Sequence, residues 1–97
     1  MDIEKVIVAL NSRLRREILS ILSSEPMTVV QVLEKLNKRA IVVRYRETVY
    51  RALEKLVDSE LILKYYDKEK GLCYKLLTTK LTITITRDST EIRIDNN

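Results

Sequence analysis

The apolar residues of this 97-residue chain change their spacing near residue 60, and that change constrains the fold class. Up to Ser59 they recur every three or four residues, which is the spacing of a helix with one buried side. After Glu60 they stand in short runs or alternate with polar residues, and β-branched and aromatic residues become frequent, as in strands. The sequence therefore predicts an α+β protein with its helices first and its strands last.

Four amphipathic segments precede the change, covering about residues 2–10, 14–22, 28–37 and 45–59. Asp2 and Thr28 are good N-caps for the first and third of these helices, and Asn11 and Ser12 separate the first from the second. Pro26 prevents the second helix from continuing. The pattern predicts four helices joined by short connections.

Two β-hairpins are expected after the change. The run ELILKYYDKEKGLCYKLL has the pattern of strand, turn and strand, and Gly71 in its turn accepts a positive φ freely. Beyond it, LTITIT alternates strictly between apolar residues and threonine, and EIRID alternates again after the turn RDST. In the last strand we expect Ile92 and Ile94 to face inward.

Three helices followed by a two-stranded hairpin is the layout of a winged helix-turn-helix. LNSRLRREILSILSSEPMTVVQVLEKLN resembles the opening of small ArsR-like regulators. ETVYRALEKLVDSELILKYYD resembles the recognition helix and first wing strand shared by ArsR-like, PadR-like and Fur-like DNA-binding domains, and GLCYKLLTTK is similar to the returning strand. The resemblance covers Leu10 to Lys80. It implies that residues 1–80 form a winged helix-turn-helix DNA-binding domain, with residues 81–97 as an extra C-terminal β-hairpin of the same domain.

The chain departs from these families in ways that bear on cofactors and chemistry. It has no histidine, so the metal sites of Fur-like proteins cannot be built, and its single cysteine, Cys73, cannot form the paired-cysteine motif of ArsR-like metal sensors. We therefore expect no metal and no other cofactor. Without histidine or clustered carboxylates, the usual acid–base constellations of an enzyme cannot be assembled either, so we expect no enzymatic activity.

The excess positive charge of the chain lies in one segment. The whole chain carries a net charge of +4, and the segment from Lys38 to Lys55 holds six basic and two acidic residues, which accounts for all of that excess. A local basic patch is the electrostatic footprint of a polyanion site, although a charged run is also common on a solvated surface.

The fourth expected helix turns an apolar side, centred on Val49, away from a side rich in arginine. Arginine can bond O6 and N7 of guanine together, and tyrosine can bond a phosphate or contact a thymine methyl. The wing tip DKEKG adds two lysines. The residues expected to bind DNA are Arg44, Arg46, Glu47, Thr48, Tyr50, Arg51, Lys55, Lys68 and Lys70.

Two further observations bear on this assignment. Arg51 could instead pair with Glu47 one turn earlier, as on any solvated helix, and such pairs stabilise by only about 0.3–0.5 kcal/mol. A cluster of arginines at the start of the second helix is another candidate phosphate contact, because positive charge at a helix N-terminus is unfavourable unless it serves a purpose. That cluster consists of Arg13, Arg15 and Arg16.

These patterns favour a sequence-specific regulator of transcription that binds double-stranded DNA. The resemblance implies that the helix at about residues 45–59 enters the major groove and the wing at about residues 61–77 lies on the adjacent groove or backbone. The alternative is a winged-helix module for protein–protein interaction in a transcription or assembly complex. The sequence identifies no small-molecule effector.

A homodimer is expected because one recognition helix covers too few base pairs for specificity. The first helix is the leading candidate for the interface, and the terminal hairpin is the second. The candidate interface residues of the first helix are Ile3, Val6, Ile7 and Leu10.

The sequence also predicts a cytoplasmic protein that makes no contact with a membrane. No apolar run approaches the roughly 20 residues needed to span a bilayer. The N-terminus MDIEKVIVALNSRLRR lacks the order of basic, apolar and small residues found in a signal peptide. The lone Cys73 cannot form an internal disulfide, which fits a reducing compartment.

Overall fold

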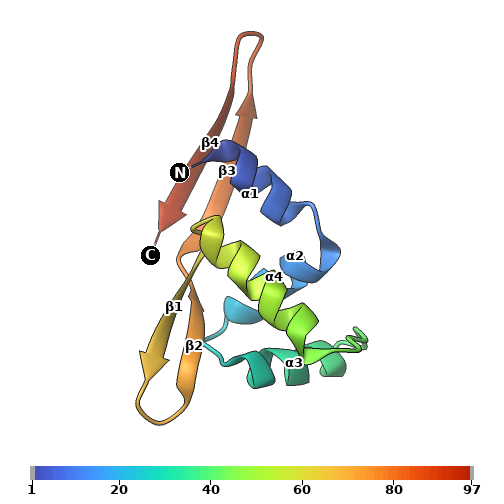
Figure 1. The fold of residues 1–97 in the computed structure, drawn as a ribbon. Coiled ribbons are helices and arrows are strands. Elements are labelled where there is room, and N and C mark those ends of the chain that lie inside the picture. The colour runs from blue at the N-terminus through green and yellow to red at the C-terminus, as the bar shows by residue number, and fades with distance from the viewer. Residues whose placement is uncertain (1, 97) are drawn as a thin grey trace.

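The computed structural model describes residues 2–96, except for the side chains of residues 78, 79 and 94–96, and it places the elements in the expected order. The helices are α1 (Ile3–Leu10), α2 (Arg13–Leu22), α3 (Val29–Lys38) and α4 (Arg46–Asp58). Two antiparallel hairpins follow, β1 (Ile62–Asp67) with β2 (Gly71–Leu76), and β3 (Thr78–Ile85) with β4 (Thr90–Asn96). We call β1–β2 the wing and β3–β4 the terminal hairpin (Figure 1). The expected α+β fold with an extra C-terminal hairpin is confirmed.

Local chemistry fixes where most of the helices begin. The side chains of Asp2, Ser12 and Thr28 each accept a hydrogen bond from a backbone N–H in the first turn of the helix that follows. Thr28 forms a complete capping box with Gln31. Helix α4 is the exception, because its N-cap residue, Tyr45, makes no side-chain capping bond. At the start of α4, the backbone N–H of Thr48 bonds the carbonyl of Tyr45 at 3.0 Å, and the first buried residue of the helix is Val49.

Two helices end in left-handed residues that are not glycine. Ala40 after α3 has a φ of 59°, and Glu60 after α4 has a φ of 65°. Each follows the hydrogen-bond pattern of a helix C-cap, for example Leu61 N–H donating to the carbonyl of Leu56 at 3.2 Å. Glycine is the usual residue at such positions, and the one glycine of the chain stands in the wing.

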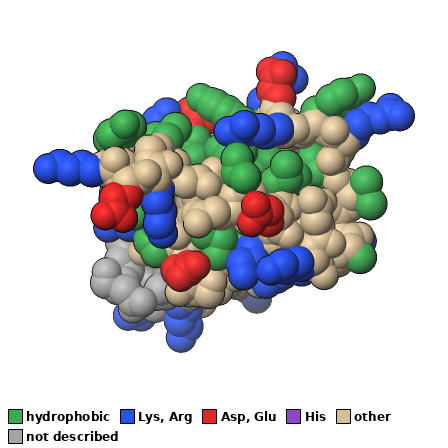
Figure 2. Space-filling model, turned by 90° about the horizontal axis from the view of Figure 1, so that it is seen from below, with side chains coloured by type: hydrophobic (Ala, Val, Ile, Leu, Met, Phe, Trp, Pro, Cys, Tyr) green, Lys and Arg blue, Asp and Glu red, His purple; other side chains and the backbone are tan. Residues whose placement is uncertain are grey.

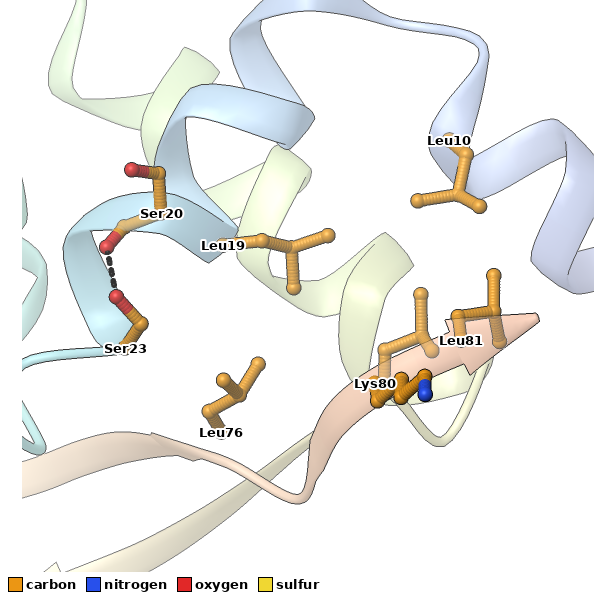
Figure 3. A pocket seen from close by; sticks show the side chains of 8 residues that line it. Leu10, Leu19, Ser20, Ser23, Leu76, Lys80 and Leu81 are labelled. Atoms are coloured by element: carbon orange, nitrogen blue, oxygen red, sulfur yellow. Dashed lines mark hydrogen bonds between the residues drawn. The ribbon is translucent and has the colours of Figure 1, made fainter. Parts of the chain in front are cut away.

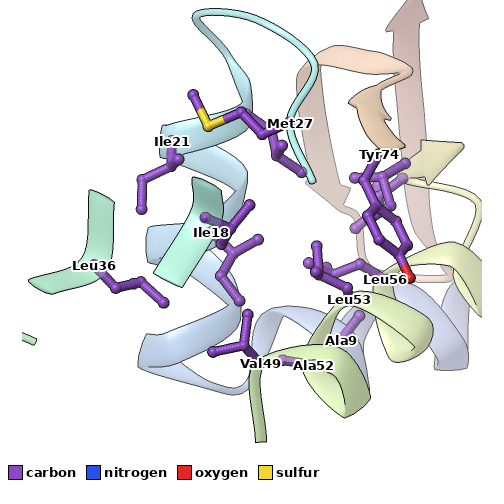
Figure 4. Close-up of a cluster of buried hydrophobic side chains, with 14 of the residues drawn as sticks. Ala9, Ile18, Ile21, Met27, Leu36, Val49, Ala52, Leu53, Leu56 and Tyr74 are labelled. Atoms are coloured by element: carbon purple, nitrogen blue, oxygen red, sulfur yellow. The ribbon is translucent and has the colours of Figure 1, made fainter. Parts of the chain in front are cut away.

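The core lies where the four helices meet the inner side of the wing. Side chains from α1, α2, α3, α4 and β2 meet there, as Figure 4 shows for Ile18, Leu36, Leu53 and Tyr74. Val6 of α1 belongs to this core and has no exposed surface. The expectation that Val6 contacts a partner chain was therefore wrong, because one domain already covers it. Ile3 and Leu10 are half-buried, and Ile7 is exposed.

A short bridge joins the wing to the start of α3. Met27 and Tyr74 exchange two backbone hydrogen bonds, with N–O distances of 3.0 and 2.8 Å. Both residues are buried, so the bridge lies inside the domain and not at its surface. No sequence pattern indicates this pairing, because Met27 is a single extended residue between Pro26 and a helix cap.

The terminal hairpin leaves the domain as an arm that passes α1 (Figure 1). Leu81 near its base and Ile92, which pairs with Ile83, are half-buried and pack against the core. Farther out on β3, Ile83 is 46 % exposed and Ile85 is 78 % exposed. The expected strict alternation is present in the strand, but the domain covers only the base of the apolar face. The expected inward position of Ile94 concerns a side chain outside the described set.

Candidate nucleic-acid interface

Helix α4 separates buried from exposed residues as the helical projection predicts. Val49, Leu53 and Leu56 have no exposed surface, and Ala52 is 5 % exposed. The exposed residues of α4 include every member that was expected to contact DNA, namely Arg46, Glu47, Thr48, Tyr50, Arg51 and Lys55. The apolar half of the helix is thus used for folding, and its arginine-rich half is left to solvent.

Basic residues next to the start of α4 extend this exposed surface. The Arg44 guanidinium lies 6.0 Å from the centroid of the Tyr45 ring, within the range of a cation–π contact. Arg44 also lines a shallow recess together with Thr48 of α4 and Arg13 of α2. Arg13, the first of the three arginines in α2, is therefore the one that joins the basic surface.

The other two arginines of that cluster have a structural role. Arg15 donates from Nη2 to the carbonyl of Val8 at 2.9 Å and from Nε to the carbonyl of Ala9 at 2.7 Å. Arg16 Nη1 donates to the carbonyl of Leu10 at 2.5 Å. These carbonyls lie in the last turn of α1, where positive charge is favourable, and that of Val8 also accepts the backbone N–H of Asn11 at 3.2 Å. Both guanidinium groups bind carbonyls at the junction of α1 and α2. These bonds offset the unfavourable position of the two positive charges at the N-terminus of α2.

Arg51 and Glu47 form the ion pair that was considered as a competing explanation. The distance from Arg51 Nη2 to Glu47 Oε1 is 2.8 Å, and the two side chains are 78 % and 70 % exposed. A pair this exposed is worth only about 0.3–0.5 kcal/mol, so Arg51 can leave it at little cost. The pair orients Arg51 along the helix without removing it from the surface.

Glu54 connects α4 to both strands of the wing. Its Oε1 lies 2.7 Å from Lys64 Nζ on β1, and its Oε2 accepts a hydrogen bond of 3.1 Å from Tyr74 Oη on β2. The bond to Glu54 raises the pKa of Lys64, and burial followed by the same carboxylate raises the pKa of Tyr74. Lys64 is thereby paired within the protein. We call these three residues the wing clamp.

The wing tip is shaped by one carboxylate. Asp67 Oδ1 accepts hydrogen bonds from the backbone N–H groups of Glu69 at 2.8 Å and Lys70 at 3.0 Å. These two bonds lower the pKa of Asp67. Gly71 completes the turn with a φ of 85°. The tip therefore presents the exposed side chains of Lys68 and Lys70 next to two carboxylates, those of Asp67 and Glu69.

An open groove separates the wing from the helices and has a volume of about 550 Å³. Arg46 and Tyr50 line it from α4, Lys70 and Leu72 line it from the wing, and Val30 lines it from α3. Figure 2 shows the molecule from the end that carries the wing tip and α3, where lysine and arginine side chains project around a face that also holds apolar and acidic groups. The groove therefore places positive charge on both of its sides.

The remaining basic and thiol groups have simpler settings. Arg39 belongs to the basic segment but pairs with Glu17 at 3.0 Å and also bonds Ser20 Oγ at 3.1 Å. Cys73 is a free cysteine with 1 % of its surface exposed, and Lys75 lies over the ring of Tyr65. These residues support the fold and add nothing to the exposed surface of α4.

Among the described side chains of residues 2–93, which leave out residues 78 and 79, no group of three or more cysteine, aspartate and glutamate side chains is arranged to hold a metal ion. Within the same residues, every helix is too short or too polar to cross a bilayer.

In known protein structures, the chain is similar to the ferric uptake regulator (Fur) of Vibrio cholerae, a protein with DNA-binding domains. The TM-score is 0.61 at 18 % sequence identity, and the match covers 89 % of this chain and 68 % of that one. The likeness confirms the winged helix-turn-helix fold and does not favour the ArsR-like family. A scan against protein-family models and a search of curated proteins found no match.

Proposed function

We propose that this protein is a sequence-specific, double-stranded DNA-binding regulator of transcription that acts as a homodimer. Helix α4 lies in the major groove, and the wing lies on the adjacent groove or the backbone. The observation that carries the proposal is the exposed surface of α4, which holds Arg46, Tyr50 and Arg51, while Val49, Leu53 and Leu56 of the same helix are fully buried. Folding needs the buried half and gives no reason for the composition of the other.

The distribution of ion pairs supports this assignment. Within the described residues, Arg44, Arg46 and Lys55 form no ion pair, and Arg51 has only its weak contact with Glu47. Positive charges that are not compensated nearby attract phosphates and release counterions on binding. The basic surface of α4 is therefore available to a polyanion, whereas Arg39 and Lys64 are not.

Different parts of the surface take different roles in the proposed complex. Arg51 and Tyr50 face outward from the middle of α4, where side chains reach base edges in the major groove. Arg46 and Lys70 stand on opposite sides of the groove between helix and wing, where they bind phosphates of one strand. Lys68 at the wing tip binds a further phosphate.

Within this proposed function, we infer that the protein is most similar to the ArsR-like regulators. The sequence segments that carry this resemblance are α2, α3, α4 and the wing, and these are the elements that form the helix-turn-helix here. No effector is assigned, because none of these segments points to a particular small molecule.

A second candidate function has one observation in its favour. Val30 is 41 % exposed and Leu72 is 41 % exposed, and both line the groove beside α4. Apolar side chains at a groove are typical of protein–protein contacts. In that reading the winged helix is an interaction module in a transcription or assembly complex.

Selection of binding sites from random double-stranded DNA tests the proposal. We expect a palindromic site to be enriched, because a two-fold dimer presents two copies of α4. Arg51→Ala should then lose about 1–3 kcal/mol on the selected site and little on scrambled DNA. Arg87→Ala, at an exposed arginine in the turn of the terminal hairpin, is the matched control and should bind like wild type. If no site is enriched and Arg51→Ala binds DNA like the control, the protein-interaction function replaces this one.

A further inference from the structure

The terminal hairpin has two faces of opposite character. Directly paired residues on antiparallel strands point to the same side, so the pairs Ile83–Ile92 and Ile85–Thr90 share one face with Leu81. The pairs Thr82–Arg93 and Thr84–Glu91, together with Lys80, occupy the other face. The charged residues of the paired strands whose side chains are described therefore all lie on the second face, and the first face is apolar. They are Lys80, Glu91 and Arg93.

The domain covers only part of that apolar face. Leu81 and Ile92 pack against the core, whereas their neighbours on the same face are more exposed, Ile83 at 46 % and Ile85 at 78 %. An isolated two-stranded hairpin is at best marginally stable in water and gains stability when a second layer packs on it. The outer half of the arm has an apolar face, like the inner face of a β-sandwich. In the single chain, no second layer covers that face.

The apolar face continues onto α1. Leu10 of α1 and Leu81 of β3 line the same crevice, which has a volume of about 250 Å³ and which Figure 3 shows from close by. Ile7 precedes Leu10 by three residues and therefore lies on the same side of the helix, where it is 42 % exposed. The two regions that the sequence offered as separate interface candidates form one surface.

We propose that this surface, made of Ile7, Leu81, Ile83, Ile85 and Ile92, is where two copies of the chain pack together. The inference deepens the proposed function, because it names the surface through which the homodimer forms. A two-fold contact places the same surface of both copies together. A surface with a net charge would therefore repel its copy, so a surface without net charge is favoured. The face meets that requirement at Ile83, Ile85 and Ile92, since Glu91 and Arg93 lie on the opposite face, while Lys80 borders the crevice beside Leu81.

The geometry of the arm also fits a second copy. Each strand of about eight residues spans roughly 25 Å, so the face of one hairpin alone falls short of the roughly 800 Å² per partner of a standard interface. Adding the outer side of α1 enlarges the contact. When two arms stack with opposite directions, the exposed isoleucines of each arm face those of the other, and both sets are buried at once.

Single glutamate substitutions on opposite faces of β3 test the surface. Ile85→Glu places a charge in the proposed contact and should raise the dimer dissociation constant at least about 100-fold. Thr84→Glu adds the same charge one residue away on the other face and should change it by less than about threefold. Because both side chains are exposed in the single chain, both variants should keep the wild-type circular dichroism spectrum. Sedimentation equilibrium over a range of protein concentrations measures the dissociation constants.

Binding to a single half-site separates this inference from the proposed function. If both hold, Ile85→Glu binds a half-site duplex like wild type and loses the tighter binding to the full palindrome. A wild-type chain that sediments as a monomer at tens of micromolar, or a Thr84→Glu variant as impaired as Ile85→Glu, overturns the dimer surface whether or not DNA is bound. A wild-type dimer that Ile85→Glu dissociates, without DNA binding by either, supports the surface and refutes the DNA function.

Discussion

The two hairpins of this protein are both antiparallel pairs of strands, yet they depend on the rest of the chain in opposite ways. The wing is held by the Met27 bridge, by the wing clamp through Glu54, and by the burial of Tyr74. Among the described side chains of the terminal hairpin, Leu81 and Ile92 pack against the core, and Ile83 and Ile85 are left exposed. Strand pairing alone therefore does not show whether the apolar face of a hairpin is buried by the same domain. The exposed fraction of the residues on that face shows it.

The largest expected difference concerns stability. Tyr74→Ala removes a fully buried ring and its hydrogen bond, and it should lower the free energy of unfolding by about 3–5 kcal/mol. Ile85→Ala in the terminal hairpin should lower it by less than about 0.5 kcal/mol at protein concentrations where the chain is monomeric. Urea denaturation of both variants measures the difference. Similar losses would show that the arm is as well packed as the wing.

The wing clamp gives a smaller effect that isolates one contact. Glu54→Ala leaves the Tyr74 hydroxyl without its acceptor and should lower the free energy of unfolding by about 1–2 kcal/mol. Lys64→Ala removes only the exposed ion pair and should cost less than about 0.5 kcal/mol. Urea denaturation of the pair provides the comparison. Equal costs would mean that the bond to Tyr74 contributes nothing beyond the ion pair.

The tips of the two hairpins should differ in their response to salt when DNA is bound. Lys68→Ala at the wing tip should weaken binding to all sequences by a similar factor and reduce the slope of log affinity against log salt by about one unit per lost phosphate contact, doubled in a dimer. Arg87→Ala at the other tip should leave the slope unchanged. Titrations at several salt concentrations measure both. A reduced slope for Arg87→Ala would place the terminal hairpin on DNA as well.

The smallest effect is a pH dependence of the wing. Its turn lowers the pKa of Asp67 below the ordinary value of 3.8, because the carboxylate accepts two backbone hydrogen bonds. The stabilisation is therefore fully present above that value and is lost as the pH falls through the lower pKa of the folded state. Wild type should be more stable than Asp67→Asn at neutral pH, and the difference should shrink below about pH 4. A difference that stays constant down to pH 2 would contradict this role.

Local pattern was enough to predict most of the fold. Asp2 and Thr28 cap helices as expected, and Gly71 stands in the wing turn. The Arg51–Glu47 pair was also foreseeable, because its partners are four residues apart on one helix. These features depend on residues close in the sequence, where helix and turn geometry alone decide what meets.

Contacts between distant residues were not predictable in the same way. Glu54 meets Lys64 and Tyr74 across ten and twenty positions, and no periodicity indicates that a helix carboxylate will reach two strands. The capping of α1 by Arg15 was equally hidden, since its partners lie six and seven residues earlier across a turn. The alternation in β3 predicted an apolar face correctly but could not tell how much of that face the domain covers.

The Met27–Tyr74 bridge has a consequence for how the protein meets its target. It fastens the wing to the residue before the cap of α3, while the wing clamp fastens the wing to α4. These contacts tie the wing to both helices that lie beside it. If the proposed DNA complex forms and this spacing is kept, the duplex would have to bend or narrow to fit, at a cost that depends on its sequence. Base pairs between the proposed contacts of α4 and the wing would then be selected by their deformability without being touched by a side chain.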